Sequence, residues 1–317
     1  RSGLRFEIND LEYPGYLNKH FTTTWAEVND LLEHTNFGRF FKTQNPFTSE
    51  VAEIVARTDD RKQQLHEILK LVQSRVTWDG YYRLSPQRSP AKAAEEGRGD
   101  SGSINCILAA ALRDAGFTPK ALLLNPRSYG RLPETFATDN IRTFVIMVML
   151  GGESLYLDGT DPHTDVGTLP PDLLVDRARI YGIDNPAGGW IDLTRQARST
   201  SHTQIEAQLT PEGELVCTQK EVATKQAAYD TSRSYARSES REGFIQTREQ
   251  EADITVSELS IKGIDTPETC LTLTFRKMPE TAGERLYLHP TVVPYLTENP
   301  FTARHRSLPV EFSYPKQ

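Results

Sequence analysis

The first two thirds of the chain mixes helical and strand patterns of apolar residues. Residues 25–41 and 60–76 repeat apolar positions at three- and four-residue spacing, which predicts amphipathic helices. The stripe of the second segment consists of Leu65, Ile68, Leu69 and Val72. A further helix is predicted over 103–115, because the Gly116 and Pro119 that follow it are typical of a helix end.

Three apolar segments after this helix predict strands. They are KALLLN at 120–125, FVIMVML at 144–150 and SLYLD at 154–158. Because every position of 144–150 is apolar, both of its faces are expected to be buried, as in a central strand. We expect this strand to pair with 154–158.

The pattern changes at about Ser199. Alternating polar and apolar residues predict antiparallel strands at 203–209, 214–222, 254–263, 270–278 and 285–290. The segment 221–244 is polar, and its structure stays open. The chain is therefore expected to be α+β, with a mixed core domain at 25–198 and a β-sandwich domain at 199–317.

Charge and apolar run length exclude some partners. The 317 residues include 36 Lys and Arg against 43 Asp and Glu, a net charge of −7. Without a basic stripe, nucleic acid is not an expected partner. The longest apolar run, 144–150, is far shorter than the roughly 20 residues that span a bilayer. Residues 1–10 also lack the apolar segment of a secretory signal.

Residues 95–117, EEGRGDSGSINCILAAALRDAGF, contain three motifs that suggest chemistry. RGD at 98–100 is too short to indicate adhesion. GDSG at 99–102 matches a chymotrypsin-type nucleophile loop, but here the Ser leads into a helix. The upstream histidines also lack the expected setting: His20, His34 and His66. We therefore set both motifs aside.

Cys106 is the third candidate. On a helix it lies away from the arc of Leu108, which predicts a small core residue. A catalytic thiol prefers the first helical turn, where the dipole lowers its pKa. Ser101 stands at that position. A second pair, Cys217 and Cys270, could form a disulfide, which the sequence does not decide.

A nucleophile at a helix start, a base on the next strand and an acid on the strand after it form the layout of transglutaminases and papain-like hydrolases. The sequence resembles the transglutaminase-like proteins of bacterial cell envelopes, whose core lies between two β domains. The resemblance is carried by SRVTWDGYY at 74–82, the segment 99–130, YLDGTDPHTDVGTLP at 156–170 and ENPFTARHRSLPVEFSYP at 298–315.

The resemblance implies specific site positions. Ser101 stands where active members have the nucleophilic Cys, Thr143 where they have His, and Asp158 where they have the acid. The segment GDSGSINC also resembles a branch that reads Gly-Asn-Ser-Ala-Glu-Ile-Asn-Leu and lacks the Cys. The acid is thus kept, whereas the nucleophile and base are absent.

Other residues are not expected to replace them. Cys106 lies about 140° around the helix from Ser101 and about 7.5 Å along it. His163 follows the acid strand in a polar turn, and a Thr hydroxyl cannot act as a base at neutral pH. Ser101 is expected to be the helix N-cap, and Asp158 a hydrogen-bonded acid at a strand end.

The sequence therefore predicts a papain/transglutaminase-like core followed by a β-sandwich. The resemblance implies that residues 1–24 are the tail of a preceding β domain, and it leaves open whether the C-terminus is truncated. A binding or scaffolding role is expected, with a protein, peptide or glycan ligand at the old cleft and no cofactor or zinc site. The alternative is an active hydrolase or acyl transferase that uses Cys106 or Ser101 in an arrangement not recognised here. The resemblance places the protein in the bacterial periplasm or cell envelope.

Overall fold

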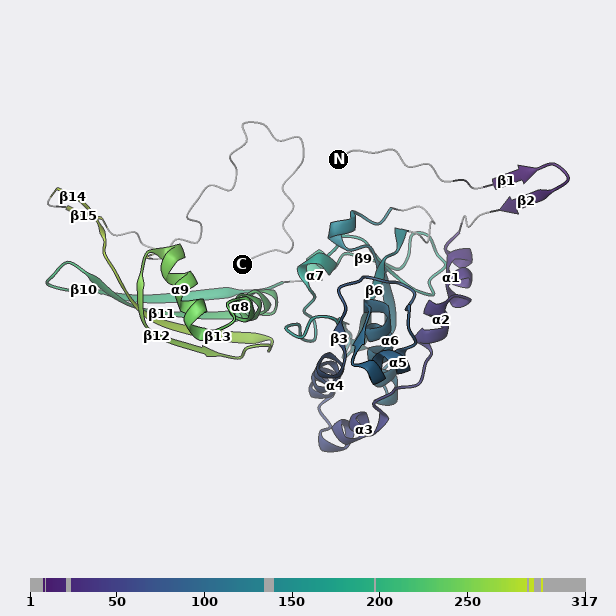
Figure 1. Cartoon of the computed structure of the whole chain (residues 1–317), viewed down its shortest axis with the longest axis horizontal. Helices are drawn as coiled ribbons and strands as arrows, with labels where there is room; N and C mark the ends of the chain where they lie inside the picture. The colour runs from purple at the N-terminus through teal and green to yellow at the C-terminus, as the bar shows by residue number, and fades with distance from the viewer. Residues whose placement is uncertain are drawn as a thin grey trace. The chain divides into compact units, whose positions relative to one another are not determined.

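The computed structural model divides into two compact units, residues 1–197 and 198–317. It describes these residues: 8, 10–20, 24–133, 140–196, 198–283, 285–287 and 292. The motif at 298–315 therefore lies outside the described residues, as does the end of the strand expected at 285–290. Both units contain helices and antiparallel sheets (Figure 1), so the predicted α+β class is confirmed.

In the described part of the first unit, a β-hairpin is followed by four consecutive helices, then by two further helices and the main sheet, and last by one short helix. The helices are α1 Trp25–Glu33, α2 Asn36–Phe41, α3 Thr48–Arg57, α4 Arg61–Arg75, α5 Pro90–Glu96, α6 Ser101–Asp114 and α7 Leu193–Gln196. The strands are β1 Asp10–Tyr13, β2 Leu17–His20, β3 Thr77–Trp78, β4 Arg98–Gly99, β5 Lys120–Leu124, β6 Thr143–Leu150, β7 Glu153–Leu157, β8 Ala178–Ile180 and β9 Trp190–Ile191.

The main sheet has the strand order β7-β6-β5-β8-β9, and every pairing in it is antiparallel. Strand β6 lies between β7 and β5, as predicted for the apolar segment 144–150. Ile146 pairs with Leu157 on one side, and Thr143 pairs with Leu124 on the other. Because Asp158 directly follows β7, it lies at the same end of the sheet as Thr143.

Helix α6 is the central helix of this unit and lies in front of β6 in Figure 1. All residues from Ser101 to Leu112 are buried, since the sheet and the neighbouring helices cover it on every side. Its Ala, Ile and Leu side chains favour a helix. The helix ends before Gly116, whose positive φ of 74° continues the chain out of the helix.

The predicted stripe of α4 is confirmed: Leu65, Ile68, Leu69 and Val72 are all fully buried. The segment 25–41 differs from the prediction, because it forms two helices instead of one. Thr35 causes the break, since its side chain caps a new helix by accepting a hydrogen bond from Phe37 N at 3.2 Å.

Arg179 organises the loop between β8 and β9. It is buried, with its guanidinium carbon 4.1 Å from the ring centroid of Trp25 and 5.1 Å from that of Trp190. Its Nη atoms donate to three backbone carbonyls of the loop, those of Ile183, Asn185 and Gly188. A single buried cation therefore joins this loop to α1.

The second unit is built on a four-stranded antiparallel sheet with the order β10-β11-β13-β12. Its strands are β10 Ser201–Leu209, β11 Leu215–Thr224, β12 Thr255–Lys262 and β13 Glu268–Lys277, and a separate hairpin contains β14 Glu280–Ala282 and β15 Arg285–Tyr287. The segment that the sequence left open forms two helices, α8 Gln226–Arg237 and α9 Arg241–Ala252.

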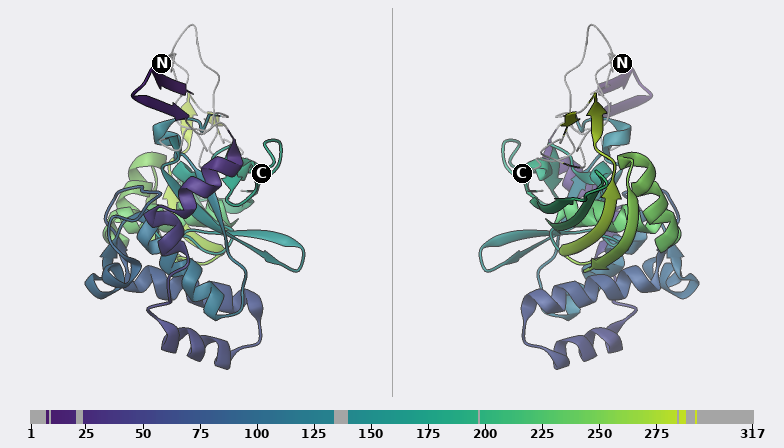
Figure 2. Two further views of the ribbon diagram at one scale, coloured as in Figure 1. Left: turned by 90° about the vertical axis from the view of Figure 1, so that its right-hand side faces the viewer. Right: turned by 90° about the vertical axis from the view of Figure 1, so that its left-hand side faces the viewer.

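These helices pack on the sheet (Figure 2). The core between them contains Phe244 of α9 together with Leu271, Leu273 and Phe275 of β13. In the described part of this unit, α8 and α9 therefore cover one face of the four-stranded sheet. In a β-sandwich, a second sheet would cover that face. The hydrophobic pattern does not predict that α8 packs on the sheet, because the buried residues of α8 include the polar Gln226 and Ser232.

Cys217 and Cys270 are free, and the sheet explains why. Cys217 pairs with Phe275, and Val222 pairs with Cys270, so the two cysteines lie five residues apart along the ladder. Five residues correspond to about 17 Å, whereas a disulfide needs Cα atoms within about 7 Å. An odd offset also places the two side chains on opposite faces of the sheet.

Candidate functional site

Ser101 and Thr143 are in direct contact at the start of α6. Their hydroxyl oxygens lie 2.8 Å apart and share a hydrogen bond. Ser101 Oγ also accepts a hydrogen bond from Arg83 N at 2.9 Å. Each of the two side chains is only 1% exposed. The structure thus brings together two of the three positions that the resemblance implies.

Ser101 is not the N-cap, so that prediction is wrong. Asp100 is the N-cap, and its carboxylate accepts hydrogen bonds from Ser103 N at 2.7 Å and from Gln87 N at 2.9 Å. Asp caps a helix as well as Ser does and stands one residue earlier. Ser101 is consequently the first helical residue, and its hydroxyl bonds to Thr143.

Asp158 is a fully buried carboxyl group at the end of β7. Its Oδ1 accepts a hydrogen bond from Asn105 Nδ2 at 2.9 Å, and its Oδ2 accepts bonds from the hydroxyl and the backbone N–H of Thr160. Burial raises the pKa of Asp158 to about 6, although the bonds from Thr160 and Asn105 oppose this shift. The site thus retains a buried acid whose acceptor atoms are already in use.

Asn105 links Asp158 to the strand that begins with Thr143. It lies one helical turn after Ser101, on the same face of α6. Its Nδ2 donates to Phe144 O at 2.8 Å as well as to Asp158, and its Oδ1 accepts from Gly159 N at 2.9 Å. The sequence analysis missed this residue; its four-residue spacing from Ser101 was the available signal.

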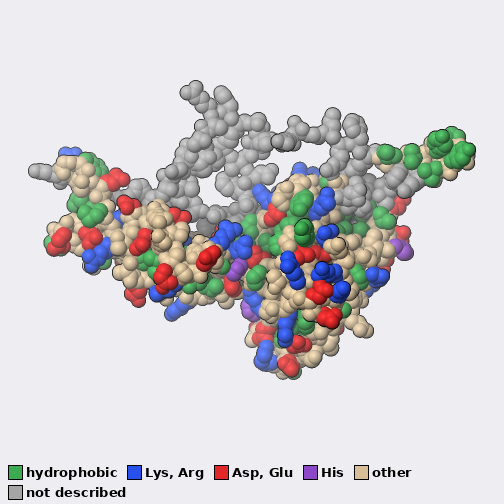
Figure 3. Space-filling model, in the orientation of Figure 1, with side chains coloured by type: hydrophobic (Ala, Val, Ile, Leu, Met, Phe, Trp, Pro, Cys, Tyr) green, Lys and Arg blue, Asp and Glu red, His purple; other side chains and the backbone are tan. Residues whose placement is uncertain are grey.

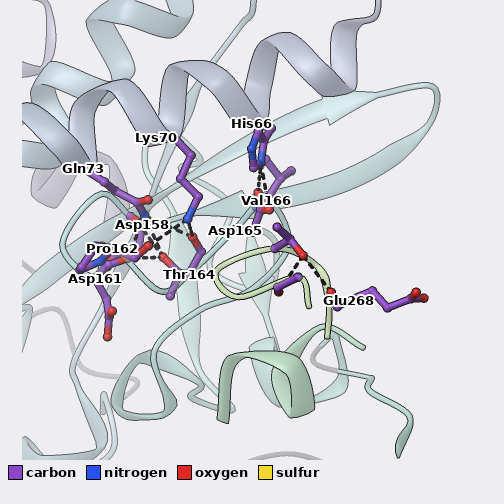
Figure 4. A network of polar contacts seen from close by, with 12 residues as sticks. His66, Lys70, Gln73, Asp158, Asp161, Pro162, Thr164, Asp165, Val166 and Glu268 are labelled. Carbon is purple, nitrogen blue, oxygen red and sulfur yellow. Dashed lines mark hydrogen bonds and ion pairs between the residues drawn. The ribbon is translucent and has the colours of Figure 1, made fainter. Parts of the chain in front are cut away.

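The turn after Asp158 is held by polar side chains of α4 (Figure 4). Gln73 Nε2 donates to Asp161 O at 2.8 Å. Lys70 Nζ donates to Pro162 O at 2.9 Å and to Thr164 O at 2.8 Å. The segment 156–170 is one of the motifs that carry the resemblance. Its backbone carbonyls accept hydrogen bonds from Lys70 and Gln73, and these bonds hold the segment against one face of α4.

His66 contacts the same turn through Asp165. Its Nδ1 lies 2.8 Å from Asp165 Oδ1 and 2.9 Å from Oδ2. The hydrogen bond with Asp165 raises the pKa of His66, and partial burial opposes this shift. The imidazole is thus engaged in joining α4 to the turn.

Among the described residues, the hydrogen-bond partners of Ser101 Oγ are Arg83 and Thr143, and neither is an imidazole. Cys106 is fully buried in the core, as expected for a small packing residue. Burial raises the pKa of its thiol far above the ordinary range, despite the nearby charge of Arg113. The neutral thiol is a poor nucleophile.

Residues 79–88, which we call the cover segment, lie over the start of α6. Ser101 N donates to Tyr81 O at 3.1 Å. The cover segment therefore forms hydrogen bonds with both the backbone N–H and the hydroxyl of Ser101. The approach is close, because a Cβ on Gly102 would lie 2.7 Å from Arg83 O. Ser101, Thr143 and Asp158 therefore do not line an open groove.

In the part of the chain that the structure describes, no group of three or more His, Cys, Asp and Glu side chains could hold a metal ion. No helix among the same residues is long and apolar enough to cross a bilayer.

Comparison with known proteins gives little further information. No protein-family model and no curated protein matches the chain. One similar solved structure is a protein from Parabacteroides distasonis described as a "putative protease". The match has 8% identity and a TM-score of 0.38, and covers 87% of this chain but 57% of that one. This chain thus spans little more than half of that protein's length.

Proposed function

We propose that this chain is a non-catalytic binding or scaffolding protein whose first unit has a transglutaminase-like core. The observation that carries the proposal is the hydrogen bond between Ser101 and Thr143. At the two positions where an active member has a thiol and an imidazole, this chain has two hydroxyl groups bonded to each other.

This pair cannot perform acyl transfer by the usual route. A Ser hydroxyl becomes a nucleophile when a neighbouring base removes its proton. Thr143 is not such a base at neutral pH. Asp158 is engaged by Asn105 and Thr160.

A binding role is compatible with a sealed site. A ligand that binds over the start of α6 would contact the cover segment. It would not contact the buried side chains of Ser101, Thr143 and Asp158. A protein, peptide or glycan is the expected class of ligand. The periplasm or cell envelope is the proposed compartment, and this part of the proposal rests on the sequence resemblance alone.

The test is a turnover assay on the wild-type chain. Casein and an acyl-donor glutamine peptide are incubated with the protein, with and without iodoacetamide, and product formation is followed. We expect no turnover. Turnover that iodoacetamide abolishes and that is lost in Cys106→Ala would establish the alternative, an active cysteine-type hydrolase or acyl transferase. Turnover lost in Ser101→Ala would indicate a serine nucleophile.

A further inference from the structure

An aromatic cluster with two arginines lies on and beside the cover segment. We call it the aromatic–arginine patch, and it consists of Trp78, Tyr81, Tyr82, Arg83, Tyr129 and Arg142. Ring centroids lie 4.9 Å apart for Trp78 and Tyr82, and 6.5 Å apart for Tyr82 and Tyr129. Residues from three separate stretches of the chain therefore meet directly beside the covered Ser101.

Two rings of the patch are exposed. Tyr81 is 61% exposed and Tyr129 is 57% exposed. Such side chains contribute little apolar burial to the fold, so core packing does not account for them. Trp78 Nε1 donates to Tyr81 O at 3.1 Å, and Tyr81 N donates to Asp79 Oδ1 at 3.0 Å. These bonds fix the backbone of the patch before any ligand arrives, which lowers the entropy cost of binding.

Each exposed ring has a guanidinium above it. The Arg83 Cζ lies 5.4 Å from the centroid of Tyr81, and the Arg142 Cζ lies 5.6 Å from that of Tyr129. The buried Arg83 Nε lies 3.9 Å from Asp100 Oδ2, so the Nη groups of Arg83 and the guanidinium of Arg142 are the donors that a ligand carboxylate would use. Basic and acidic side chains are interspersed on the face of this unit that Figure 3 shows. The two guanidinium charges of the patch are therefore the features that favour an anionic ligand.

We propose that the aromatic–arginine patch binds an acidic peptide segment of a partner protein. The inference rests on the proposed function, because it assigns a ligand class to a non-catalytic binding site. Tyr, Trp and Arg are the residues enriched in protein interfaces and at their energetic centres. Carboxylates of the peptide bond to the guanidinium groups of Arg83 and Arg142, and its apolar side chains contact the tyrosine rings.

A neutral glycan fits this patch less well. A neutral sugar has no charge to pair with the guanidinium groups beside Tyr81 and Tyr129. A long polyanion such as nucleic acid is disfavoured by the overall charge of −7. A short acidic peptide is charged, and its carboxylates contact only Arg83 and Arg142 of the patch. It is therefore compatible with both the guanidinium groups and the negative net charge of the chain.

The test uses a random dodecapeptide phage library selected on the immobilised wild-type chain. Asp and Glu are expected to be enriched in the selected peptides compared with the unselected library. The best peptide is then synthesised with a fluorescein label, and its dissociation constant is measured by fluorescence anisotropy. We expect Arg142→Gln and Tyr129→Ala each to weaken binding about tenfold.

The matched control is Arg57→Gln, which removes an exposed arginine on α3 that pairs with Glu67, away from the patch. It should leave binding unchanged. All three substitutions are at exposed or half-exposed positions, and equal urea midpoints confirm that the variants fold. Replacing Asp and Glu in the peptide by Asn and Gln should abolish binding, because the carboxylates are removed.

Several results would overturn the proposal. They are a library that yields no binders, binders without enrichment of acidic residues, and binding that is unaffected by both patch variants. An oligogalacturonate that binds the patch while acidic peptides do not would replace the peptide with an anionic glycan. These results are independent of the turnover assay: a catalytically active chain refutes the proposed function, whereas loss of peptide binding refutes only the ligand class.

Discussion

His66 and Asp165 form a hydrogen bond of 2.8 Å although 99 residues separate them in the sequence. The bond joins α4 to the turn that follows Asp158. Because the hydrogen bond with Asp165 raises the pKa of His66, the strength of this connection depends on pH.

The pKa of His66 is expected to lie above 6.5, and Asp165→Asn should lower it, because the carboxylate that stabilises the imidazolium is removed. The folded-state pKa is raised, so the stabilisation is fully present below the unfolded pKa and is lost as pH rises through the folded pKa. NMR titration of the His66 Cε1 proton in both proteins measures this. Equal His66 pKa values in the wild type and in Asp165→Asn would show that Asp165 does not stabilise the charged imidazole.

Asp158 should make stability fall with rising pH. Its pKa rises from 3.8 to about 6 in the folded state, so the folded chain holds the proton more tightly. The favourable contribution is complete below pH 3.8 and is lost as pH rises to about 6, by at most about 3 kcal/mol. Urea unfolding of wild type and Asp158→Asn at pH 4 and pH 7 gives the difference. A difference that does not change with pH would mean that folding does not raise the pKa of Asp158.

Gly102→Ala should displace the cover segment, because the new Cβ would lie 2.7 Å from Arg83 O. We expect a loss of about 1–3 kcal/mol in the free energy of unfolding. Trypsin should also cut faster after Arg83 and Arg88. Gly188→Ala is the control, since its Cβ would meet nothing nearer than 3.4 Å. Equal cleavage of both variants would contradict the close contact.

Arg179→Met should destabilise the first unit by about 3 kcal/mol, because three loop carbonyls lose their donor. Chemical denaturation measures the loss. The comparison variant is Arg39→Met, which removes an exposed arginine whose Cζ lies 4.5 Å from the Phe40 ring centroid. It should change stability by less than about 1 kcal/mol. Similar losses in the two variants would exclude a special role for Arg179.

Ser101→Cys alone should not produce turnover of casein or of a glutamine peptide, because Thr143 supplies no imidazole. The companion variant Ser101→Cys/Thr143→His supplies both groups. Comparing the two variants shows whether the missing thiol and imidazole alone account for the expected lack of turnover. Turnover in the single variant would reveal a base other than residue 143.

The sequence predicts those features that depend on local periodicity. The stripe of Leu65, Ile68, Leu69 and Val72 has helical spacing, and the apolar run 144–150 is long enough to mark a central strand. The proximity of Ser101 and Thr143 agrees with the register that the resemblance implies. The first two signals each lie within a few neighbouring residues. The third follows from the order of helix and strands that the resemblance implies.

Other features depend on contacts that local patterns do not contain. The backbone bonds of the cover segment to Ser101 and Asp100 leave no signature in side-chain hydrophobicity. Asn105 has an ordinary helical position, and only the folded structure shows that it reaches Asp158. Helices α8 and α9 are polar, because much of their surface is exposed and few apolar residues contact the sheet.

The burial of two of the three cysteines has a practical consequence for measuring local stability. Cys106 is enclosed in the first unit and Cys217 in the second, whereas Cys270 is half-buried. A buried thiol reacts with an alkylating reagent only when the structure around it opens. Alkylation rates at Cys106 and Cys217, read by mass spectrometry of the digested protein, therefore give the opening free energy of each unit separately. One sample of the unmodified chain is sufficient for both measurements.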